Sequence, residues 1–224
     1  MTKEVKILGL IAIIVIIAAV VGASYYRKSI QSERQPVTAD SRLVRPDSPT
    51  IGAADAPVTI VEFLDPECES CRAFSPTVKK ILKEYDGKVR FVVRYMALHP
   101  NSALAATVTE AAGEQEKYWQ MQEILFQRQP DWGERHGPPS ASSVSPRQDA
   151  KVLFEKYAME LGLDVGKINS AIEQNRYAAK LDRDKKDGQS LGVTRTPTFF
   201  VNGRQLARLG EQDLKSLINE ELKK

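Results

Sequence analysis

The distribution of hydrophobic residues sets the start of the chain apart from the rest. Residues 7–26, ILGLIAIIVIIAAVVGASYY, carry no charge and are mostly aliphatic. As a helix, about 20 residues span about 30 Å, the thickness of a bilayer core, and no polar stripe interrupts them. We therefore expect a transmembrane anchor after a short N-terminal tail at residues 1–6. A secretory signal peptide cleaved after Ala23 is the alternative, and either segment would export the remainder of the chain.

A polar stretch follows the apolar segment. Residues 27–50 contain three prolines and are typical of a linker, with one short edge strand expected around Leu43–Val44. Basic residues lie on both sides of the apolar segment, so the positive-inside rule does not orient it.

From residue 51 the pattern becomes that of a folded α/β domain. VTIVEFL at 58–64 and KVRFVVRYM at 88–96 are rich in β-branched and aromatic residues, which indicates buried strands. A helical stretch to about Tyr85 lies between them and contains Pro76. A strand, a helix and a strand in this order predict a right-handed crossover with parallel strands, which we assign to residues 51–100.

Residues 101–190 are predicted to be a helical block. Apolar residues recur there three and four positions apart, and a loop rich in Pro, Gly and Ser interrupts them at 130–146. Asp164 is expected to cap one of the later helices.

The last part of the chain, residues 191–224, is predicted to return to β structure. Two apolar runs are joined by Asn202-Gly203, which is a strong hairpin signal. A final amphipathic helix is expected at 211–222.

Composition and charge restrict the partners. The chain has 224 residues, is 42% hydrophobic and carries a net charge of +3, which is too weak to argue for nucleic acid. Basic residues alternate with acidic ones, as in KLDRDKKDGQ, and this run is interpreted as a solvated helix face.

The chain has only two cysteines, Cys68 and Cys71. A structural zinc site normally takes four protein ligands, and the sequence offers neither a second cysteine pair nor a His-x₃₋₅-His spacing. A purely structural disulfide across two residues would close a tiny loop and stabilise little. A redox pair is the third interpretation and the favoured one, because a thiolate on Cys68 at a helix N-terminus would be stabilised and Cys71 would lie one turn further on.

The strand, the Cys-x-x-Cys pair opening a helix, the helical block and GVTRTPTFFVNG resemble the DsbA-type branch of the thioredoxin superfamily over about residues 50–222. The resemblance implies an α/β thioredoxin fold with an inserted helical domain, preceded here by one N-terminal transmembrane helix. It also implies that Pro197 follows a cis peptide bond and that Thr196 and Pro197 lie beside the cysteines, where they present backbone to an extended substrate. Pro76 matches the family's helix kink.

Glu62 is a candidate proton carrier. It lies in an otherwise apolar strand, and an acid beneath the active-site helix would be buried, with a raised pKa. DsbA-like proteins often carry an acid at this place, so the resemblance supports proton exchange with Cys71. The alternative is a Glu on a solvated strand face.

The chain departs from the family between the two cysteines, where DsbA has Pro-His. Here the residues are Glu69 and Ser70, which we count among the substrate-contacting candidates together with Thr196 and Pro197. The negative charge of Glu69 should oppose a thiolate on Cys68, so we expect a weaker oxidant than DsbA.

A few other residues are candidates with less direct support. Trp119 and Trp132 are interpreted as packing residues, although Trp132 and His136 lie in the long loop and are also candidates for lining a substrate groove. His99 is a further candidate for a catalytic role.

Taken together, the sequence predicts a thiol:disulfide oxidoreductase that exchanges a Cys68–Cys71 disulfide with exported cysteine-containing proteins. It is expected to be monomeric, anchored by a single pass in the cell (inner) membrane with its catalytic domain on the periplasmic side, and supplied by a redox partner in the membrane. Neither a metal nor an organic cofactor is expected, because the disulfide is the redox centre. A periplasmic reductase or isomerase for a dedicated substrate, and a non-catalytic thioredoxin-fold binding module, remain as alternatives.

Overall fold

A five-stranded sheet organises the part of the chain that the computed structural model describes, residues 40–134 and 149–224. The strand order is β1-β3-β2-β4-β5. The central pair, β2 and β3, is parallel, and every other neighbouring pair is antiparallel. The strands are β1 (Thr50–Ile51), β2 (Val58–Leu64), β3 (Val89–Tyr95), β4 (Thr198–Val201) and β5 (Arg204–Gln205).

The predicted strands and hairpin are confirmed. The two central strands lie where their apolar runs placed them, and they are joined by a helix as a parallel crossover. Asn202 and Gly203 form the β4–β5 turn with φ of 46° and 84°, the left-handed region that a two-residue hairpin turn requires. The Asn202 side chain also accepts a hydrogen bond of 2.8 Å from the Thr59 backbone N–H, which ties the turn to β2.

The expected edge strand around Leu43–Val44 is wrong, because the edge strand lies at Thr50–Ile51. Leu43 is instead buried against the sheet, with 3% of its surface exposed. The stretch from Asp40 to residue 49, which we read as linker, packs onto the same compact unit as the rest of the described chain.

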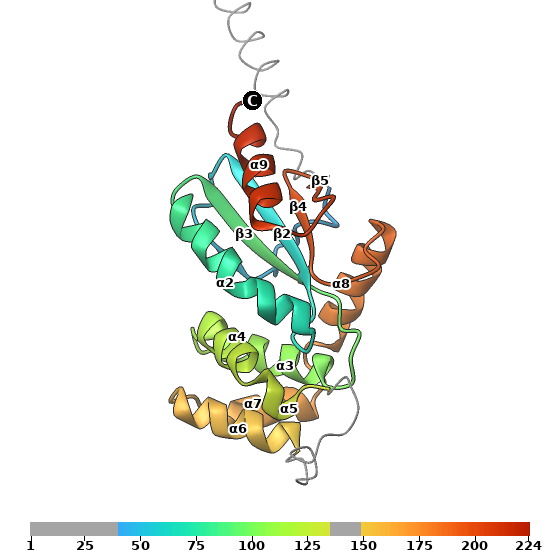
Figure 1. Cartoon of the computed structure of the whole chain (residues 1–224). Coiled ribbons are helices and arrows are strands. Elements are labelled where there is room, and N and C mark those ends of the chain that lie inside the picture. The colour runs from blue at the N-terminus through green and yellow to red at the C-terminus, as the bar shows by residue number, and fades with distance from the viewer. Residues whose placement is uncertain (1–39, 135–148) are drawn as a thin grey trace, which may run out of the picture. The chain divides into compact units, whose positions relative to one another are not determined.

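Helices cover both faces of the sheet because side chains alternate along its strands. Ile60 and Leu64 of β2 pack in one core cluster with α2 (Glu69–Glu84) and α9 (Glu211–Glu221). Val61 and Phe63 point to the opposite face, which α8 (Ala178–Ser190) covers (Figure 1).

The helical block is inserted between β3 and β4 and has a core of its own. Figure 1 shows its first helices below the sheet, at the end where α2 begins. Asp164 caps α7 as predicted, with its side chain accepting from the Lys167 N–H. The part predicted as loop from residue 130 begins in a short helix, and residues 135–148 lie outside the described chain. The helices are α3 (Ser102–Gly113), α4 (Tyr118–Gln127), α5 (Gln129–Trp132), α6 (Ala150–Glu160), α7 (Val165–Glu173) and α8.

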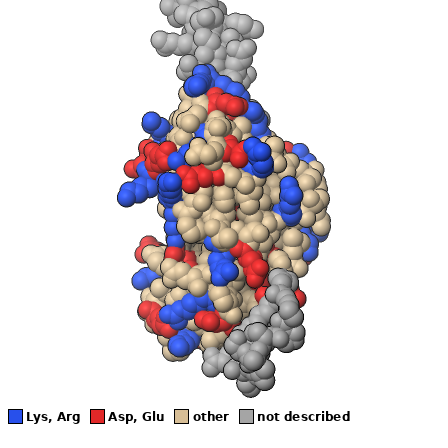
Figure 2. All heavy atoms as spheres, in the orientation of Figure 1, with Lys and Arg blue, Asp and Glu red and all other residues tan. Residues whose placement is uncertain are grey.

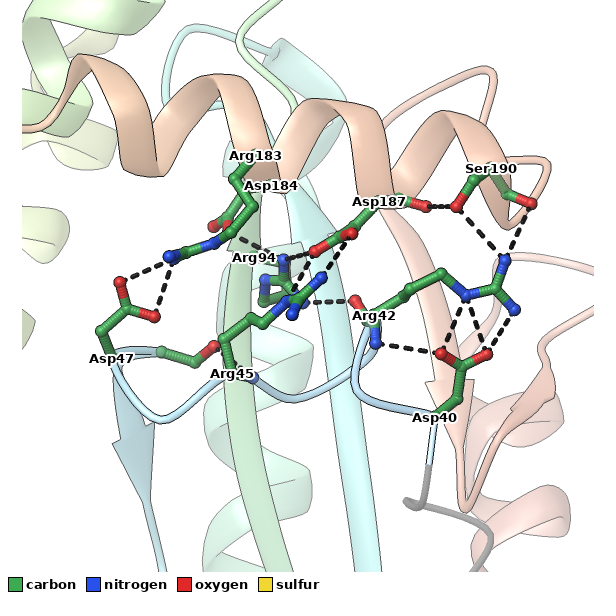
Figure 3. Close-up of polar contacts among 10 residues, drawn as sticks. Asp40, Arg42, Arg45, Asp47, Arg94, Arg183, Asp184, Asp187 and Ser190 are labelled. Atoms are coloured by element: carbon green, nitrogen blue, oxygen red, sulfur yellow. Dashed lines mark hydrogen bonds and ion pairs between the residues drawn. The ribbon is translucent and has the colours of Figure 1, made fainter.

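The interpretation of KLDRDKKDGQ as a solvated helix face is wrong. This run lies in α8, and its Lys180, Asp184 and Asp187 are buried. The reason is a fully buried guanidinium on β3: Arg94 binds Asp184 at 2.8 Å and Asp187 at 2.7 Å (Figure 3). A buried charge needs such partners, and the sequence pattern of α8 alone does not reveal them.

The same network holds the segment before β1 in place. Arg45 binds Asp187 through two hydrogen bonds of 2.9 and 2.8 Å, and the Arg42 carbonyl accepts a hydrogen bond from Arg94 (Figure 3). Asp47 pairs with Arg183 of α8 at 2.6 Å. Residues 40–47 are therefore clamped between α8 and β3 by charged side chains.

The expected membrane anchor at residues 7–26 lies outside the described residues. Within the two described stretches, 40–134 and 149–224, no helix combines the length and the apolar character needed to cross a bilayer.

Candidate active site

The two cysteines stand where β2 gives way to α2. Cys68 is the N-cap residue of the helix and Cys71 lies in its first turn, both as free thiols. Cys71 is the more buried, with 1% of its surface exposed against 9% for Cys68. One sulfur therefore lies at the surface edge and the other behind it, as a redox pair requires.

The environment of Cys68 favours the thiolate. A hydrogen bond from the Cys71 thiol is the largest influence, and it lowers the pKa of Cys68 to about 5 against the opposing effect of burial. The Thr196 side chain and the backbone N–H groups of Cys71 and Ser70 contribute in the same direction. The N–H contributions are those expected of a helix N-terminus. Cys68 is thus the more readily ionised thiol of the pair.

The environment of Cys71 has the opposite effect. Burial raises its pKa well above the ordinary value, and the hydrogen bond it donates to Cys68 adds to this. Cys71 therefore keeps its proton in the reduced protein.

Glu62 lies beneath the pair on β2 and is buried, which excludes the solvated strand face. Burial, followed by the charge of Cys68, raises the pKa of Glu62 to about 8. The charge of Glu62 in turn raises the pKa of Cys71, so the two groups are electrostatically coupled.

Glu62 also lines a cavity of about 230 Å³ between α2, α4 and the sheet. Most of its walls are apolar, among them Val78, Phe91 and Trp119. Ile51 and Lys79 on its rim are exposed, so the cavity connects the buried carboxyl with the surface.

The Thr196–Pro197 peptide bond is cis, as the resemblance implied. The Thr196 carbonyl accepts a hydrogen bond of 3.4 Å from the Cys68 thiol. The loop before β4 and the start of α2 are therefore in direct contact, although 128 residues separate the two groups along the chain.

Glu69 and Ser70 both lie at the surface next to Cys68. Ser70 lines a hollow together with the Thr196–Pro197 loop, whereas Glu69 is not among the residues of that hollow. Of the seven predicted site residues, Cys71, Glu62 and Thr196 thus interact with Cys68. Ser70 and Pro197 line the hollow together with Thr196, and Glu69 lies next to Cys68 outside that hollow.

Sequence reasoning missed the residue that holds the turn before Cys68. Asp65 is fully buried, and its carboxylate accepts hydrogen bonds from the backbone N–H groups of Glu67 and Leu98 at 2.8 and 2.7 Å. It also bonds the Ser102 hydroxyl and, at 2.7 Å, the His99 ring. Asp65 therefore joins the cysteine turn to the beginning of the helical block, and the one available signal was an acid directly after a buried strand.

Two further residues reinforce this junction. Glu67 is buried, and its carboxylate accepts from the Asn101 and Glu134 backbone N–H groups at 2.6 and 2.8 Å. Gln129 of α5 donates to the carbonyls of Pro66 and Cys68 at 2.9 and 3.2 Å. The helical block thus positions the cysteine turn through polar side chains on both partners.

The remaining candidates among the described residues lie in different parts of the structure. Trp132 is buried in the core of the helical block against Phe154, with its ring N–H bonded to the Leu125 carbonyl. Trp119 lines the Glu62 cavity. His99 is held by Asp65 at the active-site turn, and the charges of Asp65 and Cys68 raise its pKa against the effect of burial. His136 lies outside the described residues.

No group of three or more His, Cys, Asp or Glu side chains in the described part of the chain is arranged to hold a metal ion. The cysteine pair lies beside a buried acid and a cis-proline loop, and this arrangement suits thiol–disulfide chemistry.

Comparison with known proteins agrees with this geometry. The thioredoxin family matches residues 45–220 of the chain. Disulfide bond formation protein D of Bacillus subtilis is 28% identical over 182 residues, which cover 78% of this chain and 77% of that protein. The Na(+)/H(+) antiporter NhaA 3 of Salinispora tropica is 34% identical over 157 residues, or 69% of this chain, but the match spans only 21% of the antiporter.

Solved structures show the same architecture. The crystal structure of oxidised BdbD from Bacillus subtilis superposes with a TM-score of 0.69 at 27% identity, covering 80% of this chain and 94% of that one. Wolbachia pipientis alpha-DsbA1 shares the fold with a TM-score of 0.64 at 23% identity, covering 81% of this chain and 92% of that one. The chain therefore belongs to the thioredoxin family, and its fold is similar to those of BdbD and alpha-DsbA1.

Proposed function

We propose that this protein exchanges a Cys68–Cys71 disulfide with the cysteines of exported proteins and so supports their oxidative folding. The observation that carries the proposal is the position of Cys68, whose thiolate is stabilised at the N-cap of α2 next to a buried partner thiol and the Thr196–Pro197 loop. Its similarity to disulfide bond formation protein D supports the same direction of exchange.

The reaction begins when a substrate thiolate attacks the Cys68 sulfur of the disulfide. A mixed disulfide forms between the substrate and Cys68, and Cys71 leaves as a thiolate that takes up a proton. A second substrate thiolate then attacks the substrate sulfur of the mixed disulfide, and Cys68 leaves as a thiolate. The substrate has lost two electrons to the cysteine pair and gained a disulfide.

Glu62 is the proposed source of the proton for Cys71. With a pKa raised to about 8, this carboxyl is largely protonated at neutral pH, and it is electrostatically coupled to Cys71. Glu62 regains a proton through the cavity that leads from it to the exposed rim at Ile51 and Lys79. A reductase would use the same groups in the reverse direction.

Thr196 and Pro197 are proposed to present backbone to an extended substrate segment, with Glu69 and Ser70 contacting it from the helix side. The support is the contact between the Thr196 carbonyl and the Cys68 sulfur, together with the exposure of Glu69 and Ser70. The negative charge of Glu69 favours a weaker oxidant than DsbA, and that expectation remains a prediction.

The proposed setting is the periplasmic side of the inner membrane, with residues 7–26 as a single-pass anchor or export signal and with a membrane redox partner that reoxidises the pair. The protein is proposed to act as a monomer without a metal or an organic cofactor. Figure 2 shows basic and acidic side chains interspersed over the face in view, which offers no broad basic surface there for nucleic acid.

Trapping of mixed disulfides tests the proposal in cells. The Cys71→Ser variant keeps the nucleophile but lacks the resolving thiol, so it is expected to accumulate disulfide-linked complexes that disappear on reduction. The matched Cys68→Ser variant is expected to accumulate far fewer. A binding module would accumulate none with either variant, and that outcome would reject the enzyme.

A further inference from the structure

A hollow of about 370 Å³ lies beside the redox pair, on the side of the Thr196–Pro197 loop. Ser70 borders it at the start of α2, and the chain from Gln205 at the end of β5 to Leu209 forms its other wall. It has no lining residue in common with the cavity of Glu62.

The charges along this hollow are of one sign. Arg195 and Arg208 line it, and none of the described residues that line it is acidic. Arg208 is already engaged, because Asp213 accepts from its Nε and Nη2 at 3.1 and 2.8 Å. Arg195 is exposed, and its guanidinium makes no hydrogen bond or ion pair with any residue in the two described stretches.

The rest of the hollow is partly apolar. Pro197 and Phe199 lie at its inner side, and Leu206 and Leu209 belong to the opposite wall. Leu209 is 45% exposed and is therefore available for contact with a ligand. An apolar surface bordered by an unpaired guanidinium matches a peptide that carries an aliphatic side chain and a carboxylate.

The position of Arg195 relates this charge to the reaction. It immediately precedes Thr196, whose carbonyl contacts the Cys68 sulfur at 3.4 Å. An extended peptide advances about 3.3 Å per residue, so a side chain that reaches Arg195 belongs to a residue about two or three positions from the reacting cysteine.

We propose that Arg195 selects substrates that carry Asp or Glu within about two or three residues of the reacting cysteine. The inference rests on the proposed function and adds a substrate class to it. Arg195 acts by binding and orienting the substrate and takes no part in the electron transfer.

The test compares two single-cysteine peptides that differ only in Glu or Lys at positions two residues before and after the cysteine. Each peptide reduces the oxidised full-length protein, and the rate is followed by acid quench and mass spectrometry. The Glu:Lys rate ratio is measured for the wild-type protein, Arg195→Gln and Arg195→Glu. Because the peptides are the same throughout, the effect of their own charges on the cysteine cancels when ratios are compared.

The Glu:Lys ratio of the wild-type protein is expected to exceed that of Arg195→Gln by roughly two- to fivefold, the range of an exposed ion pair. Arg195→Glu should lower the ratio further, and 1 M NaCl should shrink all of these differences. Arg176→Gln removes the same charge from a side chain outside the hollow and should leave the ratio unchanged. Equal ratios for the wild-type protein and both Arg195 variants would overturn the inference.

A second reductant separates this failure from a failure of the proposed function. 2-Mercaptoethanol is small and neutral and does not need the hollow. If the wild-type protein exchanges with 2-mercaptoethanol but shows no dependence on Arg195, only the substrate class is rejected. If the wild-type disulfide does not exchange with 2-mercaptoethanol either, both proposals fail.

Discussion

The Cys68 thiol and the Thr196 carbonyl lie 3.4 Å apart, in a hydrogen bond between the N-cap of α2 and the loop before β4. The same threonine contributes through its side chain to the low pKa of Cys68. One residue of the cis-proline loop therefore both contacts the reacting sulfur and stabilises its charge.

The Thr196→Val variant is expected to raise the pKa of Cys68 above its value of about 5, by roughly one unit, because the hydroxyl that stabilises the thiolate is lost without a change of shape. The thiolate absorbance at 240 nm, followed against pH, measures this. Thr196→Ser keeps the hydroxyl and should titrate like the wild-type protein. Equal values for the Val and Ser variants would show that the hydroxyl plays no part.

Glu62 should make the oxidised protein less stable as pH rises. Burial, the first cause of its raised pKa, remains in the oxidised protein, so above about pH 5 the folded state keeps a proton that the unfolded state has lost. The free energy of unfolding should then fall by up to about 1.4 kcal/mol per pH unit until the carboxyl ionises in the folded state. Urea unfolding of the oxidised protein at several pH values measures the slope, and Glu62→Gln should remove the part of it that Glu62 contributes.

The reduced protein should behave differently over the same range. Cys68 has a pKa lowered to about 5 in the folded state, so its contribution to stability grows with pH above that value and opposes that of Glu62. Glu62→Gln in the reduced state should therefore become more stable as pH rises from 5 to 8. A flat profile in that variant would contradict the assignment of the thiolate to Cys68.

Removal of the buried Arg94 side chain should lower the free energy of unfolding more than removal of an exposed charge. The Arg94→Met variant leaves the buried Asp184 without its main cation, which should lower the free energy of unfolding by about 3–5 kcal/mol. Arg176→Met breaks an exposed pair with Glu114 outside this network and serves as the control, with an expected loss of less than about 1 kcal/mol. Similar losses for the two variants in urea unfolding would mean that the clamp of Figure 3 is not the stabilising element.

Asp65 should hold the cysteine turn against the helical block. Asp65→Ala removes the acceptor of several hydrogen bonds and should cost roughly 2–4 kcal/mol, whereas Ser102→Ala loses one of them and should cost about 1 kcal/mol. Hydrogen exchange of the Glu67 and Leu98 amides, which bond to this carboxylate, should accelerate in Asp65→Ala. Unchanged exchange at these two amides would contradict the proposed role of Asp65.

Local patterns predicted the elements that depend on local chemistry. The β2 strand, the Asn202-Gly203 turn and the Asp164 cap follow from neighbouring residues, and the structure has all three. The cysteine pair was visible because two thiols three residues apart have few other uses.

Long-range partners were not predictable from the same patterns. The charged residues of α8 look solvated unless the buried Arg94, about 90 residues earlier, is known to face them. Asp65 likewise looks like a turn residue until Ser102 and His99 are found bonded to it across the fold. Glu62 was identified because its burial follows from the strand in which it lies.

The reduction potential of the Cys68–Cys71 couple, equilibrated against glutathione, tests the central claim most directly. The stabilised thiolate of Cys68 favours the reduced form, while Glu69 should weaken that effect, so the potential is expected to lie between about −120 mV for DsbA and about −270 mV for thioredoxin. A value of about −120 mV would indicate an oxidase that donates its disulfide, and a value of about −270 mV would indicate a reductase. A pair that did not exchange with glutathione at all would contradict the account.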